Sequence, residues 1–392
     1  MAHAGRVDRI HHFHTRATTY PPDRGERPSL GDVRDALLIV VGAVVGVVAD
    51  RLVGPRLDAL ANRLWRWSRR RRTSGVVDGR IARLGGSDLV VKCADVRTGW
   101  SPSQVRIKAL GDRPAVADLI AESLVRESLP GATELQREID DVRRRMDGDD
   151  DAQWNLDHLG PRLIDPSRDD DEPYVLIEAD VHDWATHRVL RDHAEGWATG
   201  DPSRHLGQLR RVDRLTSTTL RVFLSVFTAD GTMVLGRRGT KTGIDCPDTR
   251  CTPLEAWVLA SDAAGGRVDL RAVVGRALDD QFGTDARDEL RDASLVLHTI
   301  VLNLRTLNWS ILGYVDFRRT RIDGTGIRAD RSLAPADLHW IADPLEFVPL
   351  RRRNVRALLN AGFDGWMPEA AMCTRNSLAL RAPSLLGRGV AS

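Results

Sequence analysis

The sequence predicts an α+β protein that carries one N-terminal membrane helix, and three observations support this fold class. From residue 86 onward, short apolar runs typical of strands alternate with amphipathic helical patterns. A strong turn signal, Asp230-Gly231, separates two of the apolar runs and predicts a hairpin. One uninterrupted apolar segment, Ala36 to Ala49, precedes all of these features.

Composition limits the classes of function. The chain of 392 residues is long enough for two ordinary domains. Its formal net charge of +2 hides separate clusters of arginine and aspartate, and we expect no nucleic-acid partner. Four scattered cysteines favour a reducing compartment over a disulfide framework. Cys246 and Cys251 form a C-x4-C pair, but a structural zinc site needs two more ligands, so we favour two ordinary thiols.

Residues 36–53 are predicted to form a transmembrane helix. At about 1.5 Å per residue, the apolar core of this segment covers roughly 21 Å, so a buried core helix is the alternative. Leu52 and Val53 extend the run. Many arginines follow, interleaved with Trp65 and Trp67, as is typical of the cytoplasmic headgroup region. The positive-inside rule therefore predicts a single-pass protein of the cell membrane with a cytoplasmic C-terminal part.

The flanks of this helix complete the N-terminal organisation. Residues 1–35 are expected to be a flexible tail, and residues 54–85 a basic juxtamembrane segment. Gly42 and Gly46 form a G-x-x-x-G pattern, which lets two helices approach closely and predicts a homodimer.

Residues 86–215 read as a smaller α+β region. The expected elements are a strand at Asp88 to Cys93, helices at Pro114 to Leu129 and Thr133 to Met146, a strand at Tyr174 to Ala179, and a helix through Trp184. We interpret the acidic, turn-rich stretch Asp147 to Asp171 as a solvated linker. It fails the EF-hand pattern, because Ala152 replaces the loop glycine and His158 the closing carboxylate.

Residues 216–392 show a more regular pattern. It consists of a hairpin from Leu220 to Ala229 and Met233 to Arg238, a strand at Trp257 to Ala260, a helix at Leu270 to Phe282, strands at Ala293 to Leu304 and Trp309 to Phe317, and a helix near Asn354 to Asn360.

Three segments of this block resemble the Nudix hydrolases. They are LSVFTADGTMVLGRR (224–238), AWVLAS (256–261) and RAVVGRALDDQFG (271–283), similar to the opening hairpin, the strand before the signature and the signature helix of that family. The resemblance implies an α/β/α sandwich that grips a nucleoside diphosphate-linked substrate through magnesium. It also implies catalytic roles for Asp280, Asp279 and Arg276.

The signature departs from the family at its glutamates. The three glutamate positions after Arg276 hold Ala277, Asp280 and Gln281, and the upstream position holds Val268. Magnesium prefers several hard oxygen ligands. The metal site implied by the resemblance therefore reduces to Asp280 with Asp269 nearby, and we expect weak magnesium binding at most. An ion pair between Asp280 and Arg276 is the alternative, since the i, i+4 spacing fits it equally.

Basic and aromatic residues near the hairpin are the candidate ligand-binding groups. Arg237, Arg238 and Lys241 stand at the hairpin end, where guanidinium and ammonium groups suit phosphate oxygens. A charged turn that faces water is the alternative interpretation. Trp257, in the strand before the signature helix, is the fourth candidate.

Three functional hypotheses follow. The first is a membrane-tethered, Nudix-like module that binds a nucleotide or nucleoside diphosphate-linked ligand with weak or no hydrolysis. The second is an active magnesium-dependent pyrophosphohydrolase that cleaves phosphoanhydride bonds. The third is a non-catalytic membrane scaffold. The missing glutamates favour the first hypothesis over the second.

Overall fold

The computed structural model describes residues 80–84, 87–95, 97–123, 129–146, 156–167, 174–198, 211–239, 246–282, 287, 290–317 and 341–386. They belong to one compact unit, Thr73–Ser392. The expected tail, membrane helix, helix-packing glycines Gly42 and Gly46, and Lys241 lie outside the described residues. Among the helices that the structure describes, none combines the length and the apolar character needed to cross a membrane.

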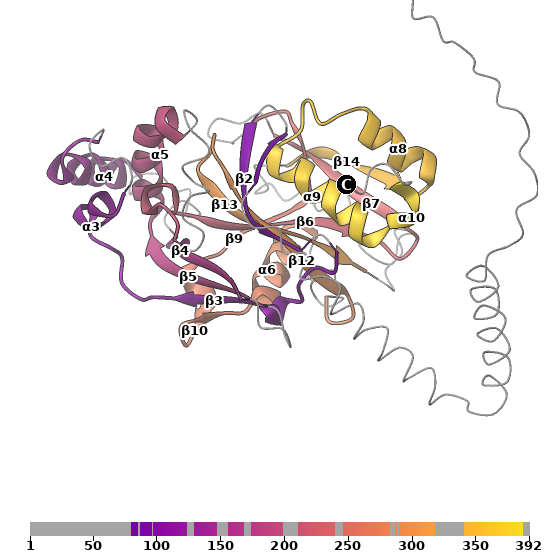
Figure 1. The fold of residues 1–392 in the computed structure, drawn as a ribbon, viewed down its shortest axis with the longest axis horizontal. Coiled ribbons are helices and arrows are strands. Elements are labelled where there is room, and N and C mark those ends of the chain that lie inside the picture. The colour runs from indigo at the N-terminus through magenta and orange to yellow at the C-terminus, as the bar shows by residue number, and fades with distance from the viewer. Residues whose placement is uncertain are drawn as a thin grey trace, which may run out of the picture. The chain divides into compact units, whose positions relative to one another are not determined.

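Two β-sheets and seven α-helices make up the described part of the chain, which confirms the α+β class. The larger sheet has the strand order β1-β2-β12-β13-β6-β7-β14, with β8 beside β7 and β9 beside β6 (Figure 1). Its strands are β1 (Arg80–Leu84), β2 (Ser87–Ala94), β6 (Leu220–Phe227), β7 (Thr232–Arg238), β8 (Arg250–Cys251), β9 (Leu254–Trp257), β12 (Ser294–Asn303), β13 (Asn308–Asp316) and β14 (Ile341–Pro349).

The smaller sheet has the order β10-β11-β3-β5-β4. Its strands are β3 (Val105–Ala109), β4 (His158–Ser167), β5 (Tyr174–His182), β10 (Ala263–Ala264) and β11 (Arg267–Val268).

Both faces of the larger sheet are covered, because its central strands are apolar on both sides. On β6, Phe223 and Phe227 pack into the core under α8 (Arg352–Asn360), α9 (Pro368–Arg381) and α10 (Pro383–Leu386). Val222 and Leu224 pack on the opposite face, with α6 (Leu270–Phe282) and the smaller sheet. The larger sheet therefore lies between two layers.

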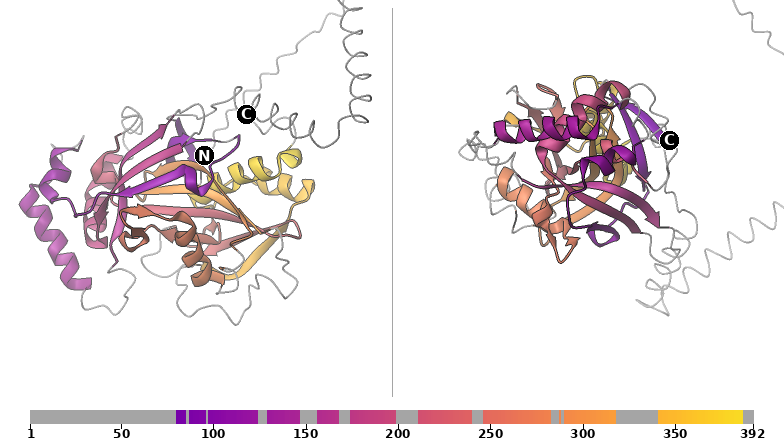
Figure 2. Two further views of the ribbon diagram at one scale, coloured as in Figure 1. Left: turned by 90° about the horizontal axis from the view of Figure 1, so that it is seen from below. Right: turned by 90° about the vertical axis from the view of Figure 1, so that its left-hand side faces the viewer.

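Three further helices form their own small hydrophobic cluster. They are α3 (Val116–Ala121), α4 (Ala132–Met146) and α5 (Trp184–Ala198), and Leu119, Ile139 and Leu190 are among the residues buried where they meet. Figure 2 shows α3 and α4 at the end of this unit opposite the yellow helices α8 and α9.

The interpretation of Asp147 to Asp171 as a solvated linker was wrong over His158–Ser167, which form β4. Residues of β4 pair with β5 there, and Leu159 is fully buried. Acidic residues, glycine and proline hide this strand in the sequence. The structure tolerates them because β4 is an edge strand and its register shifts between Pro161 and Leu163.

Other elements confirm or adjust the sequence predictions. The helix predicted at Leu270 to Phe282 is α6 with the same bounds, and the hairpin turns at Gly231 with φ of +74°. The strand predicted at Trp257 to Ala260 lies earlier, as β9. Residues of β1 come from the expected juxtamembrane segment. Strand β2 comes from the expected 86–215 region but pairs with β12, so that region shares a sheet with 216–392.

Candidate functional site

Helix α6 carries three of the eight predicted site residues, Arg276, Asp279 and Asp280, and its apolar face fixes its position. Val273, Val274, Ala277 and Leu278 are buried in the core between the sheets. Asp269, a predicted metal ligand, precedes the helix and accepts a hydrogen bond at 2.9 Å from the Arg271 backbone N–H. Because this bond satisfies a free donor of the first turn, Asp269 acts as the N-cap.

The two aspartates of the signature helix have different surroundings. A terminal nitrogen of Arg287 lies 3.5 Å from Asp279 Oδ2. Asp280 is exposed, and its side chain makes no hydrogen bond or ion pair with another described residue. Partial desolvation by the protein raises the pKa of Asp280, Arg276 opposes this shift, and the charge of Asp279 adds to it.

Arg276 and Gln281 connect α6 to strand β9. Arg276 Nη2 donates to the Trp257 carbonyl at 2.9 Å and to Asp262 at 2.7 Å. Arg276 thus forms its ion pair with Asp262, and none with Asp280 is found among the described residues. Gln281, which stands at a glutamate position of the family signature, donates to the Glu255 carbonyl at 2.8 Å. Both polar side chains therefore hold the helix against the sheet.

The predicted phosphate-binding arginines separate at the end of β7. Arg237 is exposed and forms a 2.8 Å ion pair with Asp248. Arg238 is 4% exposed, and its Nη1 lies 2.9 Å from Glu255 Oε2. The hairpin end therefore presents one solvated guanidinium and buries the other.

A buried charge cluster, which sequence reasoning missed, lies beneath α9. It comprises Arg221, Arg238, Glu255 and Glu369. Arg221 donates to Glu255 at 2.7 Å and to Glu369 at 3.3 Å. Burial raises the pKa of Glu369, and the Arg221 charge opposes that shift. The available signal in the sequence was an arginine inside the largely apolar strand LRVFLSVF.

Trp257 belongs to an aromatic cluster next to this charge cluster. The Arg221 guanidinium lies 4.8 Å from the centre of the Trp257 ring, a cation–π distance. Trp184 and His158 contact the same indole, with ring centres 5.5 and 5.2 Å away. Burial lowers the pKa of His158 to about 4, so this imidazole is neutral at pH 7. The Trp257 ring is therefore in contact with the side chains of Arg221, His158 and Trp184.

The described residues do not fit the magnesium site that the resemblance implies. Asp269 caps the helix, Asp279 faces Arg287, and Asp280 stands alone. No group of three or more His, Cys, Asp or Glu side chains in the described ranges is placed to hold a metal ion. Cys246 and Cys251 are not joined by a disulfide bond, and burial raises the pKa of Cys251 to about 12.

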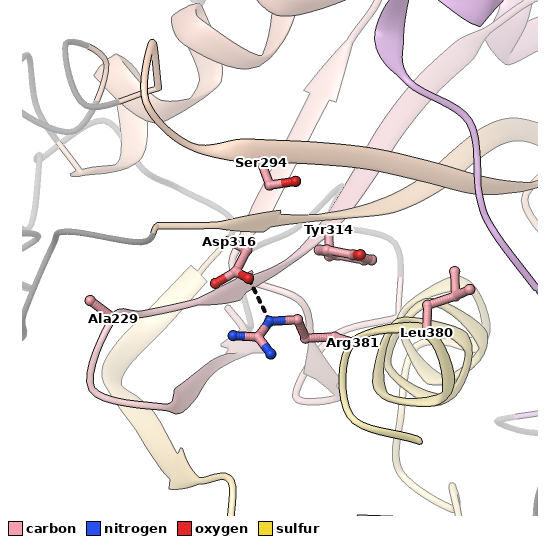
Figure 3. A pocket seen from close by; sticks show the side chains of 6 residues that line it. All are labelled: Ala229, Ser294, Tyr314, Asp316, Leu380 and Arg381. Atoms are coloured by element: carbon pink, nitrogen blue, oxygen red, sulfur yellow. Dashed lines mark hydrogen bonds and ion pairs between the residues drawn. The ribbon is translucent and has the colours of Figure 1, made fainter. Parts of the chain in front are cut away.

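A pocket of about 470 Å³ lies on the α9 side of the larger sheet (Figure 3). Its lining comes from the β6–β7 turn, the start of β12, the end of β13 and the end of α9, and consists of Ala229, Ser294, Tyr314, Asp316, Leu380 and Arg381. Sequence reasoning named none of these residues. They come from four separate segments, and only the tertiary structure brings them together.

Comparisons with known proteins give no assignment for the chain. No family model matches the sequence, and no curated protein matches it. Among solved structures, the chain is similar to the crystal structure of DR0079 from Deinococcus radiodurans. That match has 11% identity and a TM-score of 0.26, and covers 40% of this chain and 82% of DR0079. A likeness this weak carries no argument about fold or function.

Proposed function

We propose that this chain is a membrane-tethered, Nudix-like module that binds a nucleotide-type ligand with weak or no hydrolysis. The single observation that carries the proposal is that polar side chains of α6 are hydrogen-bonded to the neighbouring strand β9. Arg276 and Gln281 are bonded to carbonyls of β9, which leaves Asp280 as a lone exposed carboxylate. A lone carboxylate supplies little of the charge and coordination that magnesium requires.

Two further observations support ligand binding on this architecture. The pocket volume of about 470 Å³ falls within the ~300–1,000 Å³ typical of small-molecule sites. The pocket also lies where β6 and β13, the parallel pair of the larger sheet, reach their carboxyl ends. In open parallel α/β sheets, ligands bind outside the carboxyl ends of the strands. Among the described strands of the larger sheet, β6 and β13 alone share that parallel geometry. The cover on both faces of the larger sheet, by α8, α9 and α10 on one and by α6 with the smaller sheet on the other, supports the Nudix-like part of the proposal.

The tether rests on the sequence of residues 36–53 and the arginines after it. We expect the full-length protein to sediment with membranes and to resist carbonate extraction, and deletion of 36–53 to release it. A reporter fused after Ser392 should be cytoplasmic. Two such helices would pack through Gly42 and Gly46, so cross-linking in membranes should give a dimer that Gly42→Leu weakens. An intact protein that stays in the supernatant contradicts the tether.

Binding and hydrolysis are separated by one experiment on the purified full-length protein in detergent. Nucleoside mono-, di- and triphosphates and nucleoside diphosphate-linked compounds are titrated with and without millimolar magnesium, and products are followed in parallel. We expect binding that does not depend on magnesium and product formation no faster than in Asp280→Ala. Magnesium-dependent turnover that Asp280→Ala abolishes would establish the pyrophosphohydrolase instead. Absence of binding to every compound would favour the scaffold.

One observation favours the hydrolase as a second candidate. Asp279 and Asp280 are adjacent carboxyls, and the pKa of Asp280 is raised by desolvation. Carboxyl groups whose pKa is shifted from its ordinary value are found more often at active sites than elsewhere. The Asp280→Ala comparison therefore decides between the two candidates.

A further inference from the structure

Arg381 enters the pocket from the last turn of α9 and is held by one of its three nitrogens. Its Nε bonds Asp316 Oδ2 at the end of β13. Figure 3 shows the two side chains pointing toward one another, with the contact running from Arg381 Nε to the Asp316 carboxylate. Those two nitrogens make no hydrogen bond to another described residue. The ion pair therefore orients the guanidinium and leaves its outer edge available.

An oriented guanidinium edge is suited to a particular kind of ligand group. Two parallel N–H donors match the oxygens of a phosphoryl or carboxyl group, and charge assistance strengthens both bonds. The Arg381 side chain is 39% exposed, so an incoming anion reaches it without displacing protein. Because Asp316 fixes the fork in advance, little side-chain entropy is lost on binding.

The rest of the lining limits the charge of the ligand. Arg381 and Asp316 contribute one positive and one negative charge, so the lining is neutral in sum. A neutral lining does not compensate the several charges of a polyphosphate. It accepts a ligand that has one anionic group together with hydrogen-bond donors, which can bond to the second carboxylate oxygen of Asp316. Tyr314 gives the pocket an aromatic wall, and its ring packs edge-on against the Phe227 ring, with the ring centres 5.7 Å apart. Ala229 and Leu380 add apolar surface to the lining.

We propose that this pocket binds the phosphoryl end of a nucleoside monophosphate. The Arg381 fork receives the phosphoryl oxygens, Asp316 accepts from a ligand hydroxyl or amine, and the nucleoside lies along the Tyr314 side of the pocket. This inference rests on the proposed nucleotide-type function and narrows it from nucleotides in general to those with a single phosphoryl group.

The test measures affinities of the full-length protein in detergent by calorimetry for AMP, GMP, ATP, inorganic phosphate and glycine. We expect AMP or GMP to bind more tightly than ATP and phosphate. Arg381→Gln should weaken that binding on the order of tenfold or more, since it removes two charge-assisted bonds. Arg381→Lys keeps the charge and loses the fork, so it should also weaken binding while the protein remains folded. Arg375→Gln, an exposed arginine of the same helix, is the matched control and should bind like the wild type.

Asp316→Asn gives a readout that loss of structure does not imitate. It leaves one net positive charge in the lining, so the ratio of ATP to AMP affinity should rise at least several-fold. Wild-type binding that Arg381→Gln, Arg381→Lys and Asp316→Asn all leave unchanged overturns the pocket assignment but not the nucleotide-type function. Tighter binding of glycine than of AMP or GMP overturns the monophosphate ligand, and absence of binding to any nucleotide overturns both proposals.

Discussion

Arg221 and Glu255 form an ion pair of 2.7 Å whose side chains are only 1% and 5% exposed. The pair connects neighbouring strands β6 and β9, and Glu369 of α9 lies 3.3 Å from the same guanidinium. Charges that have lost their water are stable in a protein only while their partners remain. The cluster therefore couples the α9 layer to the centre of the larger sheet.

Arg221→Met tests this coupling. We expect the free energy of unfolding to fall by about 3–5 kcal/mol, because buried Glu369 loses its ion pair with Arg221 and buried Glu255 keeps only Arg238. Urea denaturation at pH 7 measures the change. Arg237→Ala, which breaks the exposed pair with Asp248, is the control and should cost about 1 kcal/mol or less. Equal losses of unfolding free energy in the two variants would show that the buried ion pair contributes no more to stability than the exposed one.

Local sequence patterns were sufficient to predict several elements of the fold. Helix α6 has the predicted bounds because its apolar residues recur at helical spacing. The hairpin was found because Asp-Gly is a strong turn signal. Helix α9 escaped prediction, since Pro368 to Leu378 is almost entirely buried and polar residues such as Glu369 and Asn376 interrupt its apolar pattern.

The site was less predictable than the fold because its contacts are distant in the sequence. Arg238 was predicted to meet phosphate, but its partner Glu255 belongs to another strand. Asp316 and Arg381 pair across 65 positions, and neither stands in a recognisable motif. Charge spacing predicts partners within one helix and gives no signal for partners on different elements.

Two glycines with opposite surroundings give a second prediction. A Cβ on Gly313 of β13 would lie 2.3 Å from the Val296 carbonyl oxygen, a backbone atom that cannot move alone. We expect Gly313→Ala to destabilise the protein by about 1–3 kcal/mol through overpacking. A Cβ on Gly275 of α6 would meet its nearest atoms at 3.7 Å, an ordinary contact. Gly275→Ala should stabilise by about 0.5–1 kcal/mol, since alanine favours a helix. Thermal unfolding of both variants would contradict this account if the signs were reversed.

Buried histidines predict how stability depends on pH. Burial lowers the pKa of His298 to about 3, against an ordinary value of 6.5. Between these values the unfolded chain binds a proton that the folded chain does not. Stability is therefore fully present above pH 6.5 and declines as the pH falls, by about 1.4 kcal/mol per unit for this group.

His298→Gln isolates this contribution, because His182, whose pKa is also lowered to about 3, titrates equally in both proteins. The variant loses the imidazole contacts to Thr299 and Ser377 and should be less stable at pH 7. Its deficit relative to the wild type should shrink by about 1.4 kcal/mol per unit from pH 6 to 4.5. Urea titrations at several pH values measure the deficit, and a deficit that does not change with pH would show that His298 titrates alike in both states.

The last prediction concerns the two positions where the family signature has glutamates and this chain does not. Ala277 is 2% exposed and packs in the core, and Gln281 is 8% exposed and donates to the Glu255 carbonyl. Ala277→Glu with Gln281→Glu places one carboxylate among apolar groups and sets the other against a carbonyl oxygen. We expect a loss of about 3 kcal/mol or more in the free energy of unfolding, whereas Asp280→Glu on the exposed side of α6 should change it by about 0.5 kcal/mol or less.

Measuring the stability of the double variant at increasing magnesium concentrations shows whether the new carboxylates bind a metal ion. A ligand that binds only the folded state adds about 1.4 kcal/mol of stability for each tenfold rise in its concentration above Kd. If the two new carboxylates converged with Asp280 on a metal, the double variant would regain stability along this slope as magnesium is raised through the millimolar range. We expect no such recovery, because residues 277 and 281 are directed into packed protein and Asp280 is directed to solvent. Recovery along that slope would place a family-type metal site on α6 and would restore the hydrolase as the leading function.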